Sequence, residues 1–274
     1  MTDQKKRSAW IESNCPLLWS LLNTKAQRTL PGGLVEYIAV ASPSLIELGR
    51  NNLVSLDWHL KKLNTLCGWK TVSDNYRRDL SGVHSADRVD ELYFEIALCA
   101  SVGRFSGKLK LHPPTGKGTY SDCCFYVNSF EIYGEVKRYL DPFPHIEKPG
   151  EVLSQKAPYT RSIAKRAMDL GSKLRDVHKQ FPEGTLNILF VFNCSLAELR
   201  QDLTQALFGK ANFFNNEAKF ILKPDGLFYL DEWRNISACS LASLNPEIGV
   251  IFPFMWKNPR AESKIPMPVL EALS

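Results

Sequence analysis

The chain has 274 residues, of which 44% are hydrophobic and 23% charged, and its net charge is +5. This composition is typical of a globular protein, and a chain of this length needs no disulfides to bury a core. No stretch has the ~20 apolar residues that span a bilayer, and the apolar run 16–22 is too short for a signal peptide, so we expect a cytoplasmic protein without a membrane partner.

The cysteine pattern does not indicate disulfides or zinc. Cysteines occur at Cys15, Cys67, Cys99, Cys123, Cys124, Cys194 and Cys239, an odd number without a C-x-x-C pair. Most stand beside apolar residues, which predicts reduced, buried thiols. The five histidines show no zinc spacing either, so a structural zinc site is not expected.

Apolar periodicity in the first part of the chain predicts helices. Residues 53–66 repeat apolar side chains at helical spacing, and we interpret residues 1–85 as a helical extension of one domain that covers 1–274. A strong helix is predicted over 86–101, where Glu91 and Glu95 lie one turn apart on the same face.

The middle of the chain predicts a mixed α/β sheet flanked by helices. After the helix at 86–101, the expected order is strand, strand, strand, helix, strand, helix, at 109–112, 122–127, 130–138, 158–180, 186–192 and 195–209. The run 186–192 is apolar apart from Asn187 and is typical of a strand buried on both faces. Residues 210–274 add short strands around Phe220, Phe228, Ala238 and Ile251.

The second and third predicted strands form a hairpin around Asn128-Ser129. With a two-residue turn, Val127 pairs with Phe130, and Asp122 then lies opposite Glu135. One face becomes apolar, and the other carries Asp122, Cys124, Tyr126, Glu131, Tyr133, Glu135 and Lys137. Opposed residues have Cβ atoms about 4.5–5.5 Å apart, so two carboxylates there repel unless a cation lies between them. Oxygen ligands suit Mg²⁺ or Mn²⁺, and Lys137 on the same side can orient a water.

The series of Asp122, twelve further residues, and then Glu135-Val136-Lys137 resembles the PD-(D/E)xK nucleases, which have the restriction-endonuclease-like fold. The predicted αβββαβ order over 86–209 is similar to the core of that family. The resemblance implies metal-dependent hydrolysis of phosphodiester bonds in DNA, or in some members RNA, and leaves endonuclease and exonuclease action open.

The resemblance also implies residue roles. Asp122 and Glu135 would be the metal carboxylates, the Val136 carbonyl a further ligand and Lys137 the catalytic lysine. Family members often place a glutamate on the first core helix near the metal, and Glu95 is the candidate here with Glu91 in reserve. The proline that precedes the acid in the family is Ser121 in this chain.

Two alternatives stay open. Glu135 and Lys137 could be surface residues on the solvated face of a hairpin, and other acid-x-Lys triplets occur elsewhere, as at Glu217. The chain could also be a catalytically inactive module that keeps the fold and binds nucleic acid or a protein partner. A metabolic enzyme on another α/β sheet would need a cofactor fingerprint, which the sequence lacks.

A basic segment suggests where a nucleic acid would bind. Residues 155–180 hold seven Lys or Arg and two Asp, so the segment has a net charge of +5, which equals that of the whole chain. Phosphate contacts are expected from Arg161 and Lys165 on the predicted helix. Lys117, in the Gly/Lys loop at 115–119, is a third candidate.

Overall fold

The computed structural model describes residues 3–22, 43–83, 86–105, 107–139, 163–193, 199–209, 211–213, 220–222, 225–245 and 249–273. Helices cover α1 Asp3–Asn14, α2 Pro16–Leu21, α5 Pro43–Cys67, α6 Trp69–Ser81, α7 Ala86–Val102, α8 Ile163–Leu174, α9 Leu199–Phe208 and α10 Met267–Leu273. Strands are β1 Leu109–Leu111, β2 Cys123–Val127, β3 Phe130–Tyr139, β4 Leu186–Asn193, β5 Ala211–Phe213, β6 Phe220–Leu222, β7 Ala238–Asn245 and β8 Gly249–Lys257. The 3-10 turns are η1 Gly103–Phe105, η2 Arg175–Gln180, η3 Leu227–Tyr229 and η4 Asp231–Trp233.

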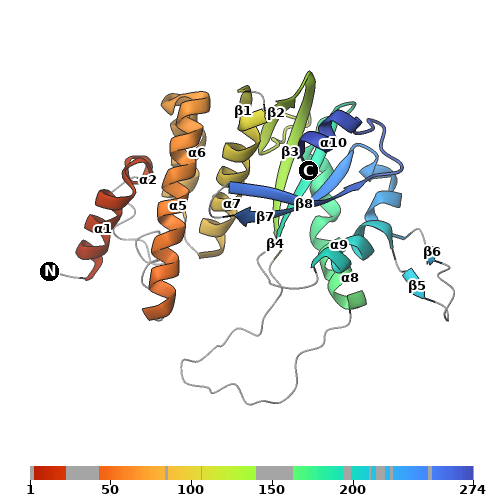
Figure 1. Ribbon diagram of the computed structural model, residues 1–274, viewed down its shortest axis with the longest axis horizontal. Coiled ribbons are helices and arrows are strands. Elements are labelled where there is room, and N and C mark those ends of the chain that lie inside the picture. The colour runs from red at the N-terminus through yellow and green to blue at the C-terminus, as the bar shows by residue number, and fades with distance from the viewer. Residues whose placement is uncertain are drawn as a thin grey trace, which may run out of the picture. The chain divides into compact units, whose positions relative to one another are not determined.

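Six strands form one mixed sheet in the order β1-β2-β3-β4-β7-β8 (Figure 1). The β1-β2 and β2-β3 pairs are antiparallel, and β4 and β7 are parallel. The expected mixed α/β class and the αβββαβ order, from α7 through β4, are confirmed. The tail differs from expectation, because β7 and β8 are long strands of the main sheet.

The strand expected around Phe228 is wrong. That residue lies in η3, fully buried, with its ring 5.3 Å from Phe208 and 6.2 Å from Trp233. Phe228 belongs to the apolar run 227–230, and its strand-like composition does not reveal the two ring contacts that accompany the 3-10 turn.

Contacts along the chain divide it into two compact units. The first comprises Met1–Pro113, Tyr120–Val136 and Asn245–Val250, and the second comprises Pro114–Thr119, Lys137–Leu244 and Ile251–Ser274. The boundary in β3 falls between Val136 and Lys137.

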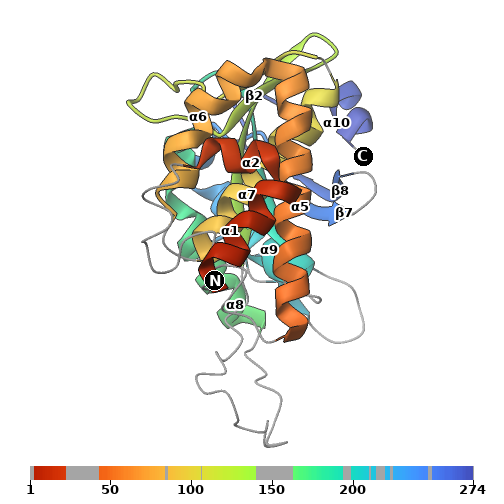
Figure 2. The same ribbon diagram turned by 90° about the vertical axis from the view of Figure 1, so that its left-hand side faces the viewer.

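The first unit is built on helices that pack around α5 (Figure 2). α5 packs against α2, α6 and α7, and its residues Leu53, Leu56, Leu60 and Leu63 are all buried. Gly68 separates α5 from α6 with a φ of +79°, a conformation that glycine adopts without the steric cost of a Cβ. The helical extension expected before residue 85 is therefore present in the described residues.

The hairpin of the first unit has the predicted register. Val127 pairs with Phe130, and Cys123 pairs with Gly134, so the next step along the ladder sets Asp122 opposite Glu135. Asn128 in the turn has a φ of +55°, as tight hairpin turns require. Phe125 and Ile132 on the apolar face are fully buried, which fixes the register because a one-residue slip would expose them.

The second unit is centred on β4. Residues Ile188 to Phe192 are fully buried, as expected for a central strand, and α8 packs against α9. Asn187 is also buried, and its amide donates to the carbonyls of Pro182 at 2.8 Å and Asn235 at 2.6 Å. The predicted helix over 158–180 instead ends at Leu174 and continues as η2, where the Arg175 carbonyl accepts the Trp233 indole N–H at 3.0 Å.

Gly226 allows the η3 segment to lie directly against α9. A Cβ at this position would stand 2.4 Å from both the Gly209 nitrogen and the Leu207 carbonyl oxygen, which are backbone atoms that cannot move aside. We therefore expect Gly226→Ala to lower the free energy of unfolding by about 1–3 kcal/mol, measured by urea denaturation. Gly171→Ala is the control, since a Cβ there meets nothing within 4 Å; an equal loss in both variants would contradict the packing argument.

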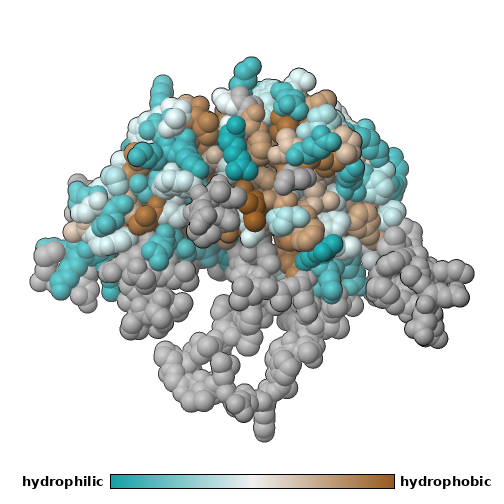
Figure 3. Space-filling model, in the orientation of Figure 1, coloured by the Kyte–Doolittle hydropathy of each residue, from teal (hydrophilic) through white to brown (hydrophobic). Residues whose placement is uncertain are grey.

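The described surface carries hydrophobic residues in small groups among hydrophilic ones (Figure 3). Large exposed apolar side chains are Val54, Trp58, Tyr120, Met168, Phe254 and Met267. Across the described ranges, helices lack either the length or the apolar character that crossing a bilayer requires.

Candidate functional site

The two hairpin carboxylates lie together at the end of β2 away from the turn. Asp122 immediately precedes β2, and its backbone N–H donates to Glu135 Oε2 at 3.3 Å. In return, Asp122 Oδ2 accepts the Val136 backbone N–H at 2.7 Å. Glu135 is 1% exposed, so the alternative of an ordinary solvated surface residue does not hold for it. A carboxylate this deeply buried requires compensation by hydrogen bonds or a cation.

Glu95 reaches the same region from α7. It is 8% exposed, and its Oε1 lies 2.6 Å from His112 Nε2. Glu91, the reserve candidate, is exposed and pairs with Arg88 at 2.9 Å. Of the two glutamates on this helix, Glu95 is therefore the one in the protein interior.

His112 is a residue of this region that the sequence analysis considered only as one of five histidines without zinc spacing. Its backbone N–H donates to the Asp122 carbonyl at 3.1 Å, and its φ is +45° although Pro113 follows. A non-glycine residue rarely adopts this conformation, and a following proline disfavours compact backbone conformations further. Such strain often occurs at functional sites. The sequence signal was the position of His112 at the end of β1, which pairs with β2 next to Asp122.

His112 lies in the field of several carboxylates. Burial lowers its pKa, but the hydrogen bond with Glu95 and the charges of Glu95, Asp79 and Glu135 outweigh burial and raise the pKa above its ordinary value of 6.5. Glu95 and Glu135 therefore act on the same imidazole, although they come from a helix and a strand far apart in the sequence.

Buried groups form one wall of the site. The Tyr76 ring stands edge-on to His112 with 5.3 Å between centroids, and its hydroxyl donates to the Cys99 sulfur at 3.6 Å. The Cys99 thiol lies 3.9 Å from the Asp122 carbonyl oxygen. Burial, followed by the charges of Cys99 and Glu95, raises the Tyr76 pKa well above 10. Tyr76 and Cys99 are both fully buried, so this side of His112 and of the Asp122 backbone is closed to water.

Five of the six described cysteines are buried free thiols, as expected: Cys15, Cys99, Cys123, Cys124 and Cys239. Cys67 is a free thiol that is only half-buried, and Cys194 lies outside the described residues.

The other end of the polar hairpin face has a structural role. Glu131 Oε1 lies 2.8 Å from Lys110 Nζ and accepts the Tyr126 hydroxyl at 2.5 Å. The hydrogen bonds from Lys110 and Tyr126 lower the pKa of Glu131 to about 2. Glu131 therefore has a cationic partner on its own sheet.

Lys137 follows Val136 in β3 and is half-buried. Strand alternation places its side chain on the same side of β3 as Glu135. Glu135 and Lys137 therefore both lie in β3, and a shared role for them stays a prediction.

The donor set fits a hard divalent cation in chemical type. Two carboxylates and the Val136 carbonyl offer oxygen ligands only, as Mg²⁺ and Mn²⁺ prefer, and such ions keep several waters. In the described part of the chain, no three His, Cys, Asp or Glu side chains are grouped so as to hold a metal ion. A cation here would thus depend on the two hairpin carboxylates, the carbonyl and water.

Of the three predicted phosphate contacts, only the side chain of Lys117 lies within the described residues. Arg161 lies outside the described residues, and Lys165 lies in α8 with its side chain outside them. Lys117 pairs with Glu183 at 2.8 Å, in a loop where Gly116 and Gly118 have positive φ. Farther along the basic segment, Lys179 pairs with Asp176 at 2.7 Å.

No protein-family model matches the chain, and neither the curated proteins nor the solved structures include a significant match.

Proposed function

We propose that this protein is a divalent-metal-dependent nuclease of the restriction-endonuclease-like fold, hydrolysing phosphodiester bonds of DNA or RNA. One observation carries the proposal: Asp122 and Glu135 lie opposite each other at the end of a hairpin, with Glu135 almost fully buried. The order of elements from α7 to β4 and the half-buried Lys137 on the same strand support it.

Each group of the proposed site has its own role. Asp122 and Glu135 would hold Mg²⁺ or Mn²⁺, with the Val136 carbonyl as a further ligand. The cation would supply the positive charge that a scissile phosphate and an attacking water need. Lys137 orients that water and neutralises charge that develops on the phosphate. Glu95, held by His112, adds negative charge beside the carboxylate pair and strengthens its preference for a cation.

The test is cleavage of plasmid, single-stranded DNA and RNA with Mg²⁺, Mn²⁺ or a chelator. Lys137→Met is expected to lower the cleavage rate by about 100-fold or more, because a charge aimed at the transition state is lost. Lys110→Met is the matched control, since Lys110 pairs with Glu131 on the same hairpin, and it should cleave like the wild type. Absence of cleavage on every substrate, together with absence of metal binding by calorimetry, would contradict the proposal.

A second candidate is a non-catalytic module that binds nucleic acid through this fold. It is favoured by the bonds of Asp122 and Glu135 to backbone amides, which partly compensate the carboxylates without a cation. Salt-sensitive DNA binding that survives Glu135→Gln, in a protein that cleaves nothing, would select this candidate.

A further inference from the structure

The second unit contains a pocket that the nuclease proposal does not use. It has a volume of about 330 Å³. Its walls come from α8, η2, α9 and the segment around η3, at Ala167, Met168, Gly171, Ser172, Arg175, Gln205, Ala206, Gly209, Asp225, Leu227 and Leu230. This volume lies at the lower end of the range for small-molecule sites.

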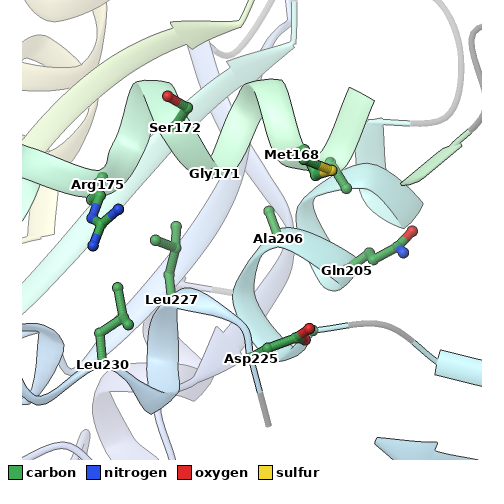
Figure 4. Close-up of a pocket in the computed structure, with 11 residues that line it drawn as sticks. Met168, Gly171, Ser172, Arg175, Gln205, Ala206, Asp225, Leu227 and Leu230 are labelled. Atoms are coloured by element: carbon green, nitrogen blue, oxygen red, sulfur yellow. The ribbon is translucent and has the colours of Figure 1, made fainter. Parts of the chain in front are cut away.

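Small residues create the space. Gly171 stands in α8 where a longer side chain would enter the pocket, and its missing Cβ would meet no atom within 4 Å. Ala206 faces it from α9, and Leu227 is buried beneath (Figure 4). Most of the lining is apolar, so the pocket favours an apolar body over a fully polar ligand.

Charge gives the pocket a direction. Figure 4 shows the Arg175 guanidinium at the side of Leu227 and Leu230, with Asp225 and Gln205 toward the other side. None of the ion pairs within the described ranges involves the Arg175 guanidinium, whereas the backbone carbonyl of Arg175 accepts the Trp233 indole N–H. An anionic group would be attracted toward Arg175 and repelled from Asp225, which orients a ligand along the pocket.

We propose that this pocket binds a small amphipathic anion, with an apolar aromatic or acyl body over Gly171 and Ala206 and one acidic headgroup on Arg175. The site is separate from the hairpin carboxylates, and its test does not depend on nuclease activity.

Two dyes of similar shape separate the apolar and ionic parts of the proposal. The anionic 1-anilinonaphthalene-8-sulfonate is expected to bind the full chain saturably, with a Kd on the order of tens of micromolar, measured by fluorescence titration. Neutral N-phenyl-1-naphthylamine reports the apolar part alone. Arg175→Gln should raise the Kd of the anionic dye about fivefold or more and leave the Kd of the neutral dye unchanged. Lys173→Gln removes the same charge from the end of α8 and should change neither.

Filling the pocket tests its location. Gly171→Leu should raise the Kd of both dyes at least about tenfold. Gly171→Ala should keep the wild-type Kd for both, because Ala leaves most of the space open. Ala206→Leu fills the same space from α9 and replaces Gly171→Leu if that variant does not show wild-type circular dichroism. Wild-type binding of both dyes by a folded pocket-filling variant would overturn the site. Equal loss of both dyes in Arg175→Gln, or no change in either, would overturn the assignment of the anionic headgroup.

Discussion

Glu135→Gln is expected to lower metal-dependent cleavage by at least about 1000-fold without lowering the free energy of unfolding. Glutamine keeps the shape of the side chain and an oxygen that can accept the Asp122 N–H, which Glu135 now accepts at 3.3 Å. It removes a buried negative charge beside Asp122 and within the field of Glu95. In the absence of metal, less repulsion should leave the variant as stable as the wild type or more stable.

This opposition between activity and stability distinguishes a functional acid from a structural one. Glu131→Gln, four residues earlier in β3 and on the same face, is the matched control. Glu131 pairs with Lys110 and Tyr126, so its replacement should weaken the hairpin slightly and leave cleavage unchanged. Since Glu131 is partly exposed, the loss should be small. Cleavage rates and urea unfolding without metal give both quantities.

A second readout follows from His112: burial lowers its pKa, but Glu95, then Asp79 and then Glu135 raise it, so that the pKa lies above its ordinary value. Glu135→Gln should therefore lower the His112 pKa, as measured by NMR titration. An unchanged cleavage rate with reduced stability would show that Glu135 is structural, and the nuclease proposal would lose its main support.

Local pattern predicts the hairpin well, for a physical reason. The period of two along β2 and β3, with a turn at Asn128, leaves one register that buries Phe125 and Ile132. The opposition of Asp122 and Glu135 then follows without knowledge of any distant contact. The apolar run around β4 is also predictive by itself, because among strands a central one is apolar on both faces.

Features that depend on contacts between distant residues could not be predicted from the sequence. The bond between Glu95 and His112 joins residues on α7 and at the end of β1, and the sequence contains nothing that specifies their contact. β7 and β8 have strand character, but only their pairing shows that they extend the main sheet. Lys117 illustrates the same limit, since its acidic partner, Glu183, lies far along the chain.

The second large effect concerns His59, which should make the protein less stable in acid. His59 is 2% exposed in α5, between the rings of Trp58 and Tyr93, and its Nδ1 has no hydrogen-bond partner within the described structure. Burial, and then the charge of Lys62, lowers its pKa to about 4. In the unfolded chain the His59 imidazole is protonated below about pH 6.5, whereas in the folded chain it stays neutral down to about pH 4. Stability should therefore fall by about 3 kcal/mol from this residue alone as pH drops between those values.

His112 should act with the opposite sign, because its folded pKa lies above the unfolded value. Its contribution is fully present below about pH 6.5 and is lost as pH rises through the folded pKa. Urea unfolding at pH 7.5, 6.0 and 4.5 separates the two residues. His59→Leu should lose less stability than the wild type between pH 6.0 and 4.5, and His112→Gln should lose less between pH 6.0 and 7.5. If His59→Leu lost as much stability as the wild type between pH 6.0 and 4.5, other groups would cause the acid dependence. Burial of the neutral His59 imidazole in α5 would then not explain it.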